Sequence, residues 1–250
     1  MRNRSFATVP KRHLTLVTNG KQPSTAPCPW HTGSQVLDAD IREVRSSSDR
    51  EALDRFRHRV SVMDTNRRHG KINHQFSNTT SKAPSGNAVQ LVAMRDSDIV
   101  GTVQISYASM QDLGVEADFY RMREAAGDNH PSGTCIVSRL LVEPDYRGSD
   151  LGQRMCVSAY RNALDANVRT AFLRCNDPLV FYFAALGFKP YMGKSWHTQY
   201  GEVLPMKLDL LDEQYLEMID SPFVSELRAW KQSRMPNVKI TTRPHAPETP

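Results

Sequence analysis

The sequence lacks the features that mark membrane-spanning, disulfide-rich and zinc-binding proteins. Its 250 residues contain no uninterrupted apolar run of about 18 residues, the length that a membrane-spanning helix needs. Its four cysteines are far apart, and none forms a CxxC pair near histidines: Cys28, Cys135, Cys156 and Cys175. We therefore expect no membrane span, no metal site and a reducing, cytoplasmic environment.

Excess basic charge is also missing from most of the chain, although the formal net charge is +5. Residues 1–38 hold five basic residues against Asp38 alone, so this segment carries +4 and the remainder carries +1. The remainder shows no basic stripe interleaved with aromatic residues, so nucleic-acid binding is only weakly indicated. Because proline and polar residues dominate both ends, we expect a disordered basic arm at 1–38 and a flexible tail at 234–250.

Between these ends, strand-like and helix-like patterns follow one another. Strands are predicted at 41–45, 88–94, 99–107, 134–142, 170–174, 188–191 and 202–210. Helices are predicted after an N-cap at Asp49 and at 110–127, 151–166, 178–186 and 213–233, the last divided at Pro222. The polar stretch 66–86 is long for a loop, and we expect a lid or substrate loop there. The order of predicted strands and helices along the chain indicates one α/β or α+β domain with a mixed sheet.

One strand–loop–helix segment has the pattern of an anion site. A predicted strand ends before a loop at 145–150, and a helix starts near Leu151. Gly148 in the loop and Gly152 in the first helical turn allow close approach to exposed N–H groups, and Arg147 can add a charged contact. The alternative is that the glycines only allow the chain to turn. This alternative explains the loop about as well as an anion site does. The spacing fits neither a Walker-type phosphate loop nor the GxGxxG dinucleotide fingerprint.

A second segment adds to the interpretation of this loop as an anion site. Phe181-Tyr-Phe-Ala-Ala-Leu-Gly-Phe188, together with Val142-Glu-Pro-Asp-Tyr-Arg-Gly148 and Leu151-Gly152, resembles the GNAT superfamily of acyl-coenzyme A-dependent N-acyltransferases. The resemblance covers about 40 to 210. It implies a GNAT-like domain at 39–210, with a mixed, mostly antiparallel sheet flanked by helices, and a C-terminal helical extension at 211–233.

The resemblance also implies roles for individual residues. Strand residues would offer their backbone to the pantetheine arm of the donor: Leu140, Leu141 and Val142. Loop and helix residues would hold its diphosphate: Arg147, Gly148, Ser149, Asp150, Leu151, Gly152 and Gln153. Tyr182 falls where many members keep a tyrosine that protonates the leaving thiolate. Asp150 departs from the family's glycine, because a carboxylate aimed at a diphosphate would repel it, so either this side chain turns outward or the donor is held differently.

A narrower resemblance concerns N-acyl amino acid synthases and, more distantly, autoinducer synthases. It rests on Ser138-Arg139, on the acidic insertion at 110–130, and on an ending that contains Tyr200-Gly201, Pro205-Met206 and Ser221-Pro222-Phe223. Those relatives often take acyl groups from acyl carrier protein. Arg57 and Arg139 fit the arginines of autoinducer synthases, so Arg139 is a candidate catalytic residue. Ile136 and Gln104 replace a glutamate and an arginine, so homoserine lactone synthesis is not expected.

The implied reaction is direct attack of a primary amine, on a small molecule or amino acid, on an acyl-CoA, acetyl-CoA or carrier-protein thioester. Tyr182 is the expected acid, and N–H groups near Leu141–Val142 would stabilise the oxyanion. The base stays open between Glu116, Asp112, Glu143 and a water relay. His197 and Trp196 border either an acceptor pocket or a solvated loop. Two other classes remain: a non-catalytic acyl-thioester-binding module, and a nucleic-acid-binding protein that uses the basic arm.

Overall fold

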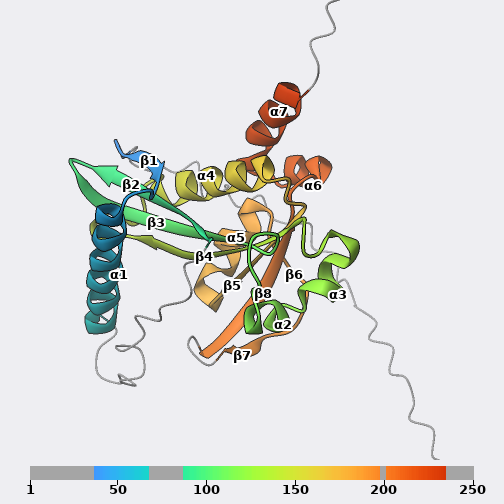
Figure 1. Ribbon diagram of the computed structural model, residues 1–250, viewed down its shortest axis with the longest axis horizontal. Helices are drawn as coiled ribbons and strands as arrows, with labels where there is room; N and C mark the ends of the chain where they lie inside the picture. The colour runs from blue at the N-terminus through green and yellow to red at the C-terminus, as the bar shows by residue number, and fades with distance from the viewer. Residues whose placement is uncertain (1–36, 68–86, 198–200, 235–250) are drawn as a thin grey trace, which may run out of the picture.

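The computed structural model describes residues 37–67, 87–197 and 201–234, which form one sheet with helices on both faces (Figure 1). The strands are β1 (Asp40–Glu43), β2 (Val89–Arg95), β3 (Asp98–Tyr107), β4 (Thr134–Val142), β5 (Thr170–Cys175), β6 (Lys189–Pro190), β7 (Ser195–His197) and β8 (Gly201–Asp209). The helices are α1 (Ser47–Arg67), α2 (Val115–Phe119), α3 (Met122–Ala126), α4 (Leu151–Asp165), α5 (Val180–Leu186), α6 (Glu213–Met218) and α7 (Phe223–Arg234).

The strand order is β1-β2-β3-β4-β5-β8-β6, and β7 pairs with β8. Every pairing is antiparallel except that between β4 and β5. The predicted mixed, mostly antiparallel sheet flanked by helices is therefore confirmed. The predicted lid at 66–86, most of the arm at 1–38 and the tail at 234–250 lie largely outside the described residues.

The parallel strands β4 and β5 pair over a short distance and then separate (Figure 1). Their register ends at Ile136 opposite Phe172, and in the part of the chain that the structure describes no strand pairs with β4 on that side beyond this point. On the other side of β4, Arg139 and Leu140 both lie opposite Val103, which makes a β-bulge. A bulge bends its strand, so this irregularity accounts for the divergence of β4 from β5.

The two faces of the sheet differ in how they are covered. On one face, α4 buries an apolar stripe at four-residue spacing, and Leu151 and Met155 in it are fully buried. On the other face, α1 covers one apolar cluster that contains Phe56 and Val92. A separate cluster beneath α2 and α3 contains Phe172. The second face is therefore covered at both ends of the sheet by different helices.

The predicted N-cap at Asp49 is wrong, because α1 begins two residues earlier. The Ser46 hydroxyl accepts a hydrogen bond from the Asp49 N–H at 3.0 Å, so Ser46 is the capping residue. The Asp49 carboxylate instead accepts two hydrogen bonds from Arg42 of β1, at 2.8 and 2.9 Å. These bonds, and then the contact with Ser46, hold the pKa of Asp49 below its usual range.

The segment 110–127, predicted as one helix, contains the short helices α2 and α3 instead. Gly114 and Arg121 precede these helices with positive φ values of 50° and 46°, which an α-helix cannot contain. The C-terminal segment also forms two helices, α6 and α7, and these separate next to Pro222 as predicted. The Ser221 hydroxyl donates to the Leu186 carbonyl at 2.8 Å, which holds the extension against the end of α5.

Candidate active site at the separation of β4 and β5

The opening between β4 and β5 lies among most of the residues expected from the sequence. The loop that follows β4 leads into α4, and α5 packs against the start of α4. Ser138 on β4 and Arg174 on β5 are each two residues beyond the last pair of these strands, Ile136 and Phe172. Because side chains alternate along a strand, Ser138 and Arg174 lie on the same face as that pair, on the two sides of the opening.

The loop after β4 combines a glycine that has an open side with backbone N–H groups that bond no acceptor among the described residues. Gly148 has a φ of 86°, and no atom lies within 4 Å of the position that a Cβ would take. Within residues 37–67, 87–197 and 201–234, no acceptor contacts the N–H groups of Gly148, Gly152 or Gln153. A positive φ favours glycine, and N–H groups at the start of a helix attract anions. This part of the loop therefore suits a phosphate.

Other loop residues are engaged within the loop. The Ser149 hydroxyl donates to the Tyr146 carbonyl at 2.7 Å and accepts from the Leu151 N–H at 3.3 Å. The Leu151 side chain is fully buried. The Arg147 Nε donates to the Val142 carbonyl at 3.0 Å, which ties the loop to the end of β4. Ser149 and Leu151 thus shape the loop instead of offering these groups to a ligand.

Asp150, the departure from the family pattern, has a carboxylate that is held by other parts of the chain. It accepts a hydrogen bond from the Leu37 N–H at 3.0 Å and lies 3.9 Å from Arg154. Arg154 also donates to the carbonyls of Leu37 and Ala39, at 2.5 and 2.6 Å. The side chain makes no cap bond to α4. Of the two alternatives expected for Asp150, its partners favour the one in which the carboxylate turns outward.

Arg154→Ala is expected to lower the free energy of unfolding by about 1–3 kcal/mol, because charged donors to two partly buried carbonyls are lost. Urea denaturation followed by circular dichroism measures this change. Arg161→Ala is the matched control on the same helix, since Arg161 pairs with Glu226 while its side chain is 62% exposed. We expect the control to change stability by less than about 1 kcal/mol. Equal losses in the two variants would contradict the role given to Arg154.

Tyr182 extends from α5 onto the first turns of α4. Its hydroxyl lies 3.1 Å from the position that a Cβ on Gly152 would take, so the glycine permits this close packing. The same hydroxyl lies 3.9 Å from the Cys156 Sγ. Burial raises the pKa of Tyr182 above its usual range and raises that of Cys156 to about 12. Both groups are therefore protonated at neutral pH, as a proton donor at this place must be.

On the opposite face, Glu116 is part of a polar cluster. Arg174 forms two hydrogen bonds with the Glu116 carboxylate and a third, at 3.2 Å, with the Tyr120 hydroxyl. The His197 Nε2 lies 3.5 Å from the Glu116 Oε1. Sequence reasoning missed Arg174 and left His197 open. A charged residue inside the apolar strand Thr170–Cys175 was the available signal for Arg174.

Arg139 occupies the bulge of β4 with a φ of 55°, a strained value for a residue other than glycine. Its side chain is half-buried and makes no ion pair or hydrogen bond with the residues that the structure describes. Next to it, Leu140 and Val142 pack toward α4, and Leu141 packs toward α1. The expected pantetheine-binding residues therefore line the edge of β4 that has no neighbouring strand.

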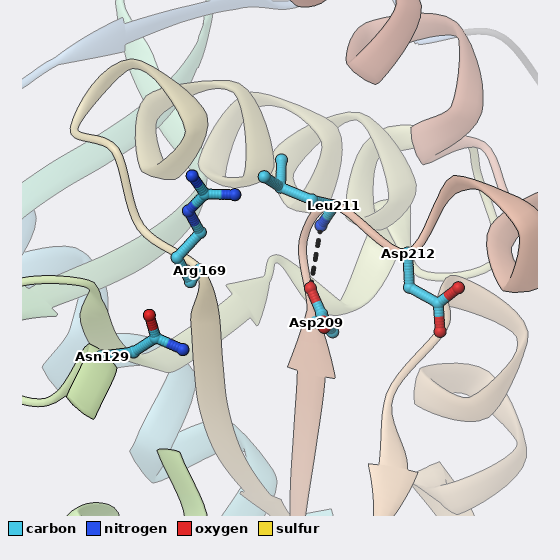
Figure 2. Close-up of a pocket in the computed structure, with 5 residues that line it drawn as sticks. All are labelled: Asn129, Arg169, Asp209, Leu211 and Asp212. Carbon is cyan, nitrogen blue, oxygen red and sulfur yellow. Dashed lines mark hydrogen bonds between the residues drawn. The ribbon is translucent and has the colours of Figure 1, made fainter. Parts of the chain in front are cut away.

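A shallow polar depression lies elsewhere, at the start of β5 and the end of β8 (Figure 2). It is lined by Asn129, Arg169, Asp209, Leu211 and Asp212. Asp209 accepts a hydrogen bond from the Leu211 N–H at 3.1 Å. Because β5 enters the sheet here and leaves it at the opening, this depression is at the opposite end of the strand and is not the candidate site.

The described residues contain no group of three or more histidine, cysteine or acidic residues arranged to hold a metal ion. Among them, too, no helix combines the length and apolarity that crossing a membrane requires.

Solved structures match this fold, whereas no family model and no curated protein sequence matches the chain. FeeM, an N-acyl amino acid synthase from uncultured soil microbes, is 14% identical with a TM-score of 0.56, over 75% of this chain and 97% of that chain. BjaI, a CoA-dependent acyl-homoserine lactone synthase solved with SAM and isopentyl-CoA, is 14% identical with a TM-score of 0.53. The match covers 78% of this chain and 99% of BjaI. TofI, solved with an inhibitor and MTA, is 15% identical with a TM-score of 0.52. The match covers 76% of this chain and 100% of TofI. The fold is shared with these proteins.

Proposed function

We propose that this chain, which has the fold of the GNAT N-acyltransferases, transfers an acyl group from a thioester of coenzyme A to a primary amine of a small molecule or amino acid. The observation that carries the proposal is the separation of β4 from β5 beside a glycine-containing loop whose N–H groups at Gly148, Gly152 and Gln153 bond no acceptor among the described residues. An acyl carrier protein presents the same phosphopantetheine group and is the alternative donor. A cytoplasmic location remains a prediction.

The donor would lie along the open edge of β4. Amides of the pantetheine arm would pair with the backbone of Leu140, Leu141 and Val142, as an added strand does. The diphosphate would bind the N–H groups of Gly148, Gly152 and Gln153, with Arg147 beside them. The Asp150 carboxylate does not oppose this binding, because Leu37 and Arg154 hold it. Ser149 and Leu151 would keep the loop in shape.

The acyl transfer would take place in a ternary complex. The amine nitrogen attacks the thioester carbonyl carbon, and the carbon–sulfur bond of the resulting tetrahedral intermediate then breaks. Tyr182 protonates the departing thiolate. Arg139, at the bulge, would place a positive charge near the oxyanion, in addition to N–H groups near Leu141–Val142. Glu116 lies on the face from which we expect the amine to approach.

The proposal is tested by calorimetric titration with acetyl, medium-chain and long-chain thioesters, each on coenzyme A and on carrier protein. We expect Gly148→Val to weaken donor binding by about tenfold or more, because its φ of 86° is strained for valine and the side chain would enter the open side of the loop. Gly127→Val is the matched control: its φ of 56° imposes a similar strain, and it lies at the end of α3. If the unaltered chain binds no thioester, or if both variants bind equally, the assignment is wrong.

A non-catalytic thioester-binding module is the second candidate. It was suggested by Asp150 and by the absence of an evident base in the sequence. The hydrogen bond from the Leu37 N–H to the Asp150 carboxylate argues against the first of these reasons. Measurement of amide product with a panel of amines distinguishes the two, because a binding module forms no product.

A further inference from the structure

A carboxylate–imidazole pair lies on the face of the opening opposite Tyr182. The His197 Nε2 is 3.5 Å from the Glu116 Oε1, and the pair joins α2 to β7, which lie close together at the bottom of the view in Figure 1. An amine in water carries an extra proton at neutral pH and is not a nucleophile until that proton is removed. This pair could receive the proton.

Arg174 of β5 fixes the orientation of the Glu116 carboxylate. It donates to both carboxylate oxygens, so the carboxylate presents a fixed edge to His197. The ring of Phe119 packs edge-on against the imidazole, with 5.2 Å between the ring centres, and the His197 side chain is only 12% exposed. Because Nε2 faces the carboxylate, the neutral imidazole carries its hydrogen on Nε2 and its lone pair on Nδ1.

Burial and a nearby positive charge favour the neutral form of His197. Burial lowers its pKa from the ordinary value of 6.5, the positive charge of Arg174 lowers it further, and Glu116 raises it in part. These two groups face the imidazole from β5 and α2. Lys194, which precedes β7, forms exposed ion pairs with Asp177 at 2.7 Å and with Glu202 of β8 at 3.4 Å. A base must be unprotonated before it acts, and a lowered pKa provides that form.

The surroundings of the pair are polar on this face. Ser138 lies across the opening from Arg174, and Gln104 is the β3 neighbour of Ser138. On the other face at the same level, Val137 and Leu173 are part of the apolar core beneath α4. A polar amine is therefore more favourably placed on the face of Glu116 and His197 than on the face of Tyr182.

We propose that His197 is the general base of the reaction and that Glu116 is its positioning residue. This inference rests on the proposed acyltransferase function. The neutral imidazole of His197 takes a proton from the ammonium group, and the freed lone pair of the amine nitrogen forms a bond to the thioester carbonyl carbon. The carbon–sulfur bond breaks, and the thiolate takes the Tyr182 proton. As the carbon–sulfur bond breaks, the amine nitrogen loses its second proton to water, and Tyr182 regains a proton from water. His197 returns its own proton to water, so that ammonium and thioester give amide, thiol and one proton.

The pH dependence of kcat/KM tests the role of His197. The active form is the neutral imidazole, so activity should fall as pH is lowered through the depressed pKa of His197. His197→Gln should lower kcat about 100-fold at pH 7 and remove this dependence. Activity of the variant should recover towards pH 9–10, where the amine loses its proton without help. KM for the donor should stay unchanged.

His130→Gln is the matched control. His130 is also partly shielded, with its pKa lowered by burial, and its Nδ1 lies 2.9 Å from the Thr134 hydroxyl at the start of β4. This position is at the end of β4 away from the opening, so the control should keep the unaltered pH profile. A wild-type profile in His197→Gln, in a chain that does transfer acyl groups, overturns the role of His197 and leaves the proposed function standing.

A measurement without substrate separates the two proposals. Nuclear magnetic resonance titration of the imidazole should show His197 protonated on Nε2 and titrating below pH 6.5, with its pKa lowered further in Glu116→Gln. No change in Glu116→Gln would overturn the positioning role of Glu116. If this result is as expected but the unaltered chain turns over no thioester, the proposed function is wrong, and the base assignment falls with it.

Discussion

Tyr182→Phe is expected to lower kcat about 100- to 1,000-fold, while the donor Kd stays within about twofold of the unaltered value. Phenylalanine keeps the ring that packs against Gly152 and removes only the hydroxyl, which lies 3.9 Å from the Cys156 Sγ. Without this proton donor the thiolate must leave unprotonated, so the loss appears in turnover. Because burial raises the pKa of Tyr182, its protonated form persists across neutral pH, and its ionisation should not limit activity there.

Initial rates at saturating donor, together with calorimetric titration of the donor, measure the two quantities. Tyr160→Phe is the control, because Tyr160 is a buried tyrosine whose hydroxyl donates to the Leu210 carbonyl at 2.6 Å. It lies in the second half of α4 and stacks on Phe223. Loss of the Tyr160 hydroxyl should lower the stability of the fold and leave turnover unchanged. Unaltered turnover in Tyr182→Phe would exclude Tyr182 as the acid.

Gly187→Ala is expected to lower the free energy of unfolding by about 2–5 kcal/mol, since it combines backbone strain with overpacking. Gly187 ends α5 with a φ of 118°, which side chains rarely adopt. An added Cβ would lie 2.7 Å from a methyl carbon of Leu216 and 3.0 Å from one of Leu208. Both neighbours are buried in the core.

Thermal and urea denaturation measure this change, and Gly193→Ala is the control, because its φ is not positive and no atom lies within 4 Å of its Cβ position. The control should stay within about 0.5 kcal/mol of the unaltered chain. Since α5 carries Tyr182, turnover of the Gly187 variant should also fall at temperatures where it remains folded. Equal stability of the two variants would show that the end of α5 tolerates a side chain.

The order of strands and helices was readable from the sequence because burial imposes a local period. The four-residue spacing of apolar residues in α4 and the long apolar strands β3 and β4 follow directly from the sheet being covered on that face. The glycine-containing loop before α4 was readable too, because glycines and a helix start stand next to one another in the sequence. The roles of the residues within the site remain predictions.

The polar cluster could not be read in this way. Glu116, Arg174 and His197 come from α2, β5 and β7, and only the packed sheet brings them together. The bulge at Arg139 depends on the register between β3 and β4, which single-sequence patterns do not define. The failure at 110–127 has a different cause: composition favoured a helix, and left-handed backbone at Arg121 interrupts it. Composition carries no information about such a φ value.

The contact between Asp150 and Leu37 has a consequence for the chain that precedes it. Residue 36 is joined by one peptide bond to the N–H that holds this carboxylate. A label or tag attached directly before Leu37, in place of residues 1–36, is therefore brought beside the loop that leads into α4. A chain shortened past Ala39 would lose both carbonyls that receive Arg154, and a negative charge would be released next to the place where phosphates are expected to bind.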